Sequence, residues 1–151
     1  MWFSRKQVSK VPPAATVADA RPLPGQVTTK SRGDAAESAA RAYLVRAGLR
    51  FVEANYRTPG RGGGEIDLVM RAPDGTLVFV EVRQRAGDSH GGAAASISSA
   101  KQQRIVLAAR HYLMRFASPP PCRFDVVLVK GALGGDARAA IEWLPAAFDA
   151  S

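Results

Sequence analysis

The chain has 151 residues, of which 46% are apolar, and a formal net charge of +8. This length allows one domain with a core but is too short to expect two. The single cysteine, Cys122, excludes an internal disulfide and a cysteine-based metal cluster, and no segment approaches the ~18 apolar residues of a membrane span. We therefore expect a cytoplasmic protein with no membrane partner, and the positive charge points to a polyanion.

Much of that charge lies at the N-terminus. Residues 1–32 hold six basic residues and one acidic residue, together with four prolines. Such a segment buries too little apolar surface to offset the cost of ordering, so we predict a disordered, basic, Pro- and Ala-rich extension. A solvated linker with no partner explains the same charge equally well. The folded domain is predicted over residues 33–151.

The first predicted helix starts at Asp34, where Asp34 and Glu37 resemble a capping box, and ends at Gly48. A second helix is predicted from Ser98, as N-cap, to Phe116, with apolar residues at helical spacing. The other segments have the β-branched and aromatic content of strands. They are Leu49–Arg57, two runs within Gly64–Arg83, Arg123–Lys130 and Ala140–Leu144. This order predicts an α/β fold, a mixed sheet of about five strands flanked by helices.

The segment Gly64–Arg83 carries the strongest signal, because its turn sets a register. Its turn residues, Ala72 to Thr76, include the Pro-Asp-Gly of a three-residue hairpin loop. If Ala72 pairs with Thr76, Met70, Leu68 and Ile66 share one apolar face with Val78, Val80 and Val82. On the other face Asp67 lies opposite Glu81, and Glu65 opposite Arg83.

Two carboxylates across a ladder repel each other, so something must compensate. Mg²⁺ or Mn²⁺ fits, because such cations prefer carboxylate oxygens and leave positions open for water and phosphate. The alternative is a hydrated pair at the sheet end, balanced by Arg83 and Arg85. That alternative suits the apolar residues around both acids less well.

Two further residues are candidates for the same site. Glu37 lies at the start of the buried stripe of the first helix, and serves equally well as a capping acid or a partner of Arg41. Lys101 lies near the start of the second helix, where a positive charge opposes the helix dipole unless a phosphate binds. Its alternative is an ordinary surface lysine.

Four ordered motifs, GEIDLVM, FVEVRQR, GGAAASISSAKQQRI and RFDVVLV, resemble the YraN family of bacterial proteins over about Gly33 to Phe148. The resemblance implies a restriction-endonuclease-like fold and a PD-(D/E)xK site. Asp67 and Glu81 would then be metal ligands, with the Val82 carbonyl and the helix-borne Glu37 as further ligands. Arg83 stands where that pattern has lysine, and arginine is a poor base. Either Lys101 supplies the missing ammonium or the site binds without cutting.

The leading hypothesis is a Mg²⁺- or Mn²⁺-dependent endonuclease acting on DNA, with structured or branched DNA favoured by analogy. Lys101 and Arg83 would neutralise charge on the phosphate. The nucleic-acid backbone would be contacted by Arg61, Arg85, Lys101 and Arg104. Two alternatives stay open: a non-catalytic nucleic-acid-binding module, which Arg83 favours, and a protein-interaction domain, which the low net charge of residues 33–151 favours.

Overall fold

The computed structural model describes residues 29–85, 97–130 and 140–150. Residues 33–151 form one compact unit. Most of the extension predicted over residues 1–32 lies outside the described residues. The described elements follow the predicted order: α2 (Thr29–Arg46), β1 (Arg50–Arg57), β2 (Glu65–Arg71), β3 (Leu77–Arg85), α4 (Ser99–Leu113), β4 (Cys122–Lys130) and β5 (Ala140–Phe148).

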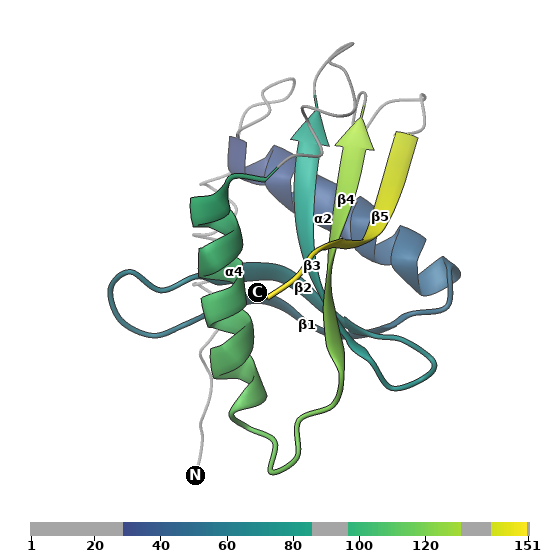
Figure 1. Cartoon of the computed structure of the whole chain (residues 1–151). Helices are drawn as coiled ribbons and strands as arrows, with labels where there is room; N and C mark the ends of the chain where they lie inside the picture. The colour runs from purple at the N-terminus through teal and green to yellow at the C-terminus, as the bar shows by residue number, and fades with distance from the viewer. Residues whose placement is uncertain (1–28, 86–96, 131–139, 151) are drawn as a thin grey trace, which may run out of the picture. The chain divides into compact units, whose positions relative to one another are not determined.

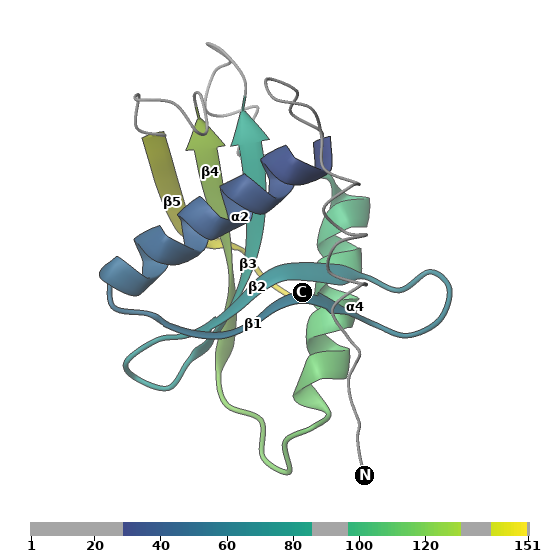
Figure 2. The same cartoon turned by 180° about the vertical axis from the view of Figure 1, so that it is seen from behind.

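The five strands form one mixed sheet in the order β1-β2-β3-β4-β5. Only β3 and β4 are parallel, and α4 connects them, as a parallel crossover requires. Figures 1 and 2 show α2 and α4 on opposite faces of the sheet. The α/β prediction, with about five mixed strands between helices, is therefore confirmed. Within the described ranges, neither helix is long and apolar enough to cross a membrane.

Each helix buries one apolar stripe against the sheet. Ala36, Ala40 and Leu44 of α2 recur every four residues and are almost fully buried. They pack on a cluster that includes Leu68, Met70, Val78 and Val80. On the other face, α4 contributes Ile105, Ala108, Ala109 and Tyr112 to a cluster with Val69, Leu77 and Phe79. The sheet core is thus closed on both sides.

Helix boundaries differ from the prediction mainly at the start of α2. The helix begins at Thr29, five residues before the predicted Asp34, so Asp34 lies inside the helix and not at its N-cap position. No proline lies between Pro24 and this helix, and one interior glycine, Gly33, costs only about 1 kcal/mol. Ser98 is the N-cap of α4, as predicted, and its Oγ accepts a hydrogen bond from the Lys101 backbone N–H at 3.1 Å.

The hairpin register is confirmed for four pairs: Arg71 with Leu77, Met70 with Val78, Val69 with Phe79 and Leu68 with Val80. The ladder ends there, so the predicted direct pairing of Asp67 with Glu81 is wrong. Glu65 is not opposite Arg83 either; it lies opposite Arg57 of β1 and forms an ion pair with it at 3.0 Å.

The ladder ends because β1 and β2 both bend at one level. Asn55 has a φ of 55°, and it lies between the pairs Ala54–Leu68 and Tyr56–Ile66. Such a residue breaks the regular alternation of side chains. Leu68 consequently packs under α2, whereas Ile66 packs with the α4 cluster. The prediction that Ile66 shares a face with Leu68 is therefore wrong.

The bend carries the end of the β1–β2 hairpin onto α4. Gly64 is where the two meet: a Cβ at this position would lie 1.9 Å from the backbone carbonyl oxygen of Arg104. Since that oxygen belongs to the helix backbone and cannot swing away, only glycine fits. Figures 1 and 2 both show the hairpin crossing α4 and continuing beyond it.

Candidate active site

Asp67 and Glu81 meet where β2 separates from β3. The Asp67 Oδ2 accepts a hydrogen bond from the backbone N–H of Val82 at 2.8 Å, which holds the strand end that the ladder no longer pairs. The Asp67 and Glu81 carboxyl groups also lie close enough for each to shift the pKa of the other. The sequence prediction thus brought together the correct residues, but they meet through their side chains and a backbone N–H rather than as a ladder pair.

Glu81 is the more deeply buried acid, with 8% of its surface exposed. Burial raises the pKa of Glu81 to about 7, and the neighbouring Asp67 carboxylate adds to the rise. Burial also raises the pKa of Asp67, although the Val82 N–H opposes the shift. Because the pKa of Glu81 is about 7, the pair retains a proton up to near neutral pH, and a bound cation would replace it.

Lys101 is the basic neighbour of the pair. Its Nζ lies 3.4 Å from the Glu81 Oε2, and 45% of its side chain is exposed. The sequence named Lys101 as a candidate for the same site as the acids, and the structure places it beside Glu81. The first turn of α4 contains no acid to offset the helix dipole. Among the described residues, the positive side chain that contacts the pair therefore comes from the helix, not from position 83.

Glu81, but not Asp67, borders an open cavity of about 570 Å³. It is lined by Glu81, Val82, Arg83, Gln84, Ser98 and Lys101. A solvent-facing cavity lined by one carboxylate and two cationic side chains can receive a phosphate group beside the acids. The fully buried half of β3 offers no such access.

Glu37 lies apart from the pair. It is on α2, and it takes a side-chain hydrogen bond from Asn55. Burial raises the pKa of Glu37, and the charge of Asp67 raises it further. The described residues include no group of three acidic, histidine or cysteine side chains that could hold a metal ion. Glu37 therefore influences the site by its charge, and the candidate ligand set has two carboxylates.

The predicted nucleic-acid contacts lie around this site, though not all within it. Arg61 is exposed in the β1–β2 loop, and Arg104 is exposed on α4, one turn beyond Lys101. Arg85 ends β3, and its side chain lies outside the described residues.

Asn55 is the residue near the site that the sequence interpretation missed. Its φ of 55° bends β1, and its side chain reaches Glu37. Asparagine is unusual within a strand and, apart from glycine, is among the residues that best tolerate a positive φ. That combination was the signal available in the sequence.

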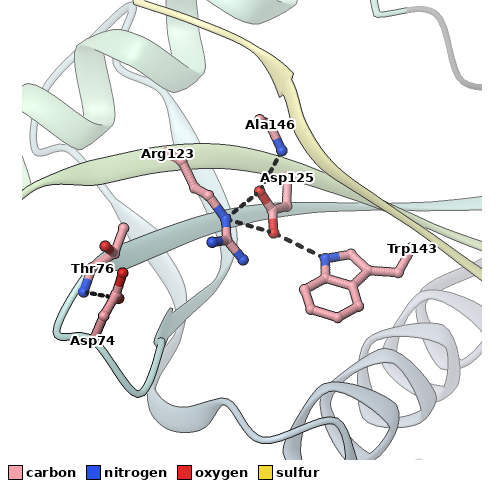
Figure 3. Close-up of polar contacts among 6 residues, drawn as sticks. All are labelled: Asp74, Thr76, Arg123, Asp125, Trp143 and Ala146. Atoms are coloured by element: carbon pink, nitrogen blue, oxygen red, sulfur yellow. Dashed lines mark hydrogen bonds and ion pairs between the residues drawn. The ribbon is translucent and has the colours of Figure 1, made fainter.

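A second buried acid, Asp125, lies on the opposite face of the sheet. In the β3–β4 ladder it pairs with Val80, whereas Glu81 pairs with Val126. Figure 3 shows its carboxylate enclosed by Arg123, Trp143 and the Ala146 backbone N–H. Because donors surround it and none of its surface is exposed, we interpret Asp125 as a structural residue.

These features define a class of protein: an α/β domain with a five-stranded mixed sheet, one helix on each face and an acidic pair at the end of two central strands. That arrangement is consistent with the predicted restriction-endonuclease-like fold.

Comparison with known proteins then identifies the family. Residues 36–129 match the Uncharacterised protein family UPF0102. A UPF0102 protein of Polaromonas naphthalenivorans (strain CJ2) is 77% identical over 153 residues, and another of Polaromonas sp. (strain JS666 / ATCC BAA-500) is 76% identical over 153 residues; both matches cover all of both chains. A UPF0102 protein of Albidiferax ferrireducens is 66% identical over 82% of this chain and 91% of its own. The chain belongs to the UPF0102 (YraN) family, as the motifs predicted.

Proposed function

We propose that this protein is a divalent-cation-dependent nuclease that hydrolyses phosphodiester bonds, with DNA as the favoured substrate. One observation carries the proposal: two neighbouring acids, the part-buried Asp67 and the buried Glu81, lie beside Lys101, and Glu81 lines an open cavity. A pair of acids in that environment is unfavourable for the fold on its own, since burial and mutual repulsion both oppose ionisation.

The donor set fits Mg²⁺ or Mn²⁺. Mg²⁺ usually binds through one or two carboxylates and keeps water and substrate phosphate in its other positions, so a third acid is not required. The Val82 carbonyl is a further candidate ligand, whereas Glu37 lies outside this ligand set. When bound, the cation would supply Lewis-acid polarisation of a phosphoryl oxygen.

The chain's own residues have separate tasks in this proposal. Lys101 binds and orients the phosphate and balances the charge that builds on its oxygens during attack by water. Arg83 lines the same cavity and adds a fixed positive charge, but it does not take a proton from water. Arg85 and Arg104 contact neighbouring phosphates. Water adds to phosphorus and one P–O bond breaks, leaving a phosphomonoester and a hydroxyl.

Arg83 also supports a second candidate, a nucleic-acid-binding module without turnover. With arginine in place of lysine, the cavity contains one ammonium, that of Lys101, held 3.4 Å from Glu81. If that ammonium does not reach the attacked phosphate, binding persists without hydrolysis.

A cleavage assay with the purified full chain tests the proposal. Labelled forked and four-way DNA should be cut with Mg²⁺ or Mn²⁺, remain intact in EDTA, and remain intact with Asp67→Asn. Asparagine preserves an oxygen acceptor for the Val82 N–H, so the variant should fold. Cleavage that persists in that variant would contradict the site. Salt-dependent binding without any cleavage would support the second candidate, and no binding at low salt would favour a protein-interaction domain.

Lys101→Met is expected to lower kcat/KM by roughly 100- to 1,000-fold, a loss comparable to the removal of one charge-stabilising donor in other enzymes. Methionine retains the length of the side chain and removes its charge. Arg110→Met, an exposed substitution on the same helix, is the matched control and should have little effect. Initial rates of cleavage at several substrate concentrations provide the comparison. Equal losses in both variants would show that Lys101 contributes only general positive charge.

A further inference from the structure

The loop between β1 and β2 projects from the domain on a fixed base. Figures 1 and 2 show this hairpin extending past α4 from both viewpoints. The Thr58 backbone N–H donates to the Gly64 carbonyl at 3.1 Å, and the Thr58 hydroxyl donates to the same oxygen at 3.3 Å. Next to it, the Arg57–Glu65 ion pair at 3.0 Å joins the two strands. These contacts hold the two ends of the loop together, and the packing of Gly64 on α4 sets the direction in which the loop projects.

The tip of the loop is unusually thin. Residues 59–64 are Pro-Gly-Arg-Gly-Gly-Gly, so only a proline and one arginine carry side chains. Gly60 and Gly62, on either side of Arg61, have φ values of 87° and 71°, which exclude most other residues. The backbone beside Arg61 can therefore approach a partner closely.

The charge of the tip is equally simple. Residues 57–64 contain two arginines and no acid. Arg57 forms an ion pair with Glu65, whereas Arg61 is exposed and makes no ion pair with any described residue. The minor groove of DNA is about 6 Å wide, and where it narrows its negative potential attracts arginine.

We propose that this loop enters the minor groove of duplex DNA and places Arg61 there. The inference rests on the proposed function, since it assigns a recognition element to the same substrate. The reach is suitable: the six residue steps from Arg61 to Asp67 span at most roughly 20 Å, the length of about six phosphates along one strand. The loop and the acid pair can therefore engage one continuous duplex.

Binding of the full chain to short duplexes, measured by fluorescence anisotropy in EDTA, tests this inference without any cleavage. The wild-type protein should bind an A-tract duplex several-fold more tightly than a G·C-rich duplex, because the A-tract groove is narrower. Arg61→Ala should weaken A-tract binding by ~10-fold and remove the preference. Arg46→Ala, an exposed substitution at the end of α2, is the control and should change Kd less than about twofold.

Two competitors sharpen the test. Netropsin, which occupies the minor groove, should displace the wild-type protein, and a duplex RNA of equal length should bind more weakly because its minor groove is wide and shallow. Equal Kd values for the Arg61 and Arg46 variants, resistance to netropsin, absence of DNA binding, or equally tight RNA binding would each overturn the inference. Arg61-dependent binding without cleavage in Mg²⁺ would instead overturn only the proposed nuclease activity.

Discussion

Replacing Glu81 with glutamine is expected to abolish cleavage and, at the same time, to stabilise the metal-free protein at pH 8. Loss of a cation ligand removes several kcal/mol of transition-state stabilisation, which corresponds to a rate at least about 10³-fold lower. The gain in stability has a separate cause. Glu81 is buried beside Asp67, and glutamine fills the same volume without the charge.

The sign of the pH dependence follows from the same carboxyl group. Its pKa is about 7 in the folded chain, against an ordinary glutamate pKa of 4.5. Between these values the folded state binds more protons than the unfolded state, so the free energy of unfolding falls as pH rises through this window. The full loss, on the order of 1–3 kcal/mol, is present above pH 7 in the wild-type protein and absent in Glu81→Gln.

Urea unfolding in EDTA at pH 5 and pH 8, beside the cleavage assay, measures both effects. Glu142→Gln is the control: that glutamate is exposed and paired with Lys130 at 3.2 Å, so the change should affect neither the rate nor the pH dependence of stability. If Glu81→Gln were less stable than wild type at pH 8, the acid pair would be a structural feature of the fold. Unaltered cleavage by the same variant would contradict its role as a ligand.

The sequence predicted the hairpin well because the turn is a local signal. Pro73, Asp74 and Gly75 determine the reversal, and the Asp74 Oδ1 accepts the Thr76 N–H at 3.0 Å, as Figure 3 shows. From that turn, counting residues gives the correct register as far as Leu68 and Val80. Hydrophobic spacing in the two helices was informative for the same reason, since each helix buries one stripe.

The prediction failed where a third strand intervenes. Asn55 of β1 lies ten residues or more from the Asp67 region in sequence, yet its positive φ bends both strands at that level. Period-two alternation assumes an unbroken strand, so it assigned Ile66 to the wrong face. The error in the strand register does not separate Asp67 from Glu81, because their side chains meet without a regular ladder.

Lys101 was only partly predictable from the sequence. Its position near the start of α4 was readable from the sequence, because Ser98 is a recognisable N-cap and the apolar spacing follows. Its contact with Glu81 depends on how α4 crosses the sheet, which is set by packing of Ile105 and Ala109 against Phe79 and its neighbours. Sequence periodicity gives the buried stripe of a helix, but the crossing position depends on the partner surface.

Asp125→Ala is expected to lower the free energy of unfolding by about 3–5 kcal/mol, the usual result of breaking a buried charged network. Its Oδ1 accepts from the Arg123 Nε at 3.1 Å and from the Ala146 N–H at 2.9 Å, and its Oδ2 accepts from the Trp143 Nε1 at 2.9 Å. Alanine would remove the buried acceptor that these three partly exposed donors share and would loosen the attachment of β5 to β4.

Asp74→Ala is the matched control, because this aspartate also accepts a backbone N–H but lies in the exposed hairpin turn (Figure 3). Urea unfolding monitored by the fluorescence of Trp143 should show a large loss for Asp125→Ala and a small one for Asp74→Ala. Since Asp125 faces α2 and Glu81 faces α4, cleavage by the remaining folded Asp125→Ala protein should stay close to wild type. Equal losses of stability in the two variants would mean that Asp125 stabilises the fold no more than a residue in a surface turn does. A loss of cleavage without a loss of stability would mean that Asp125 takes part in the chemistry of the site.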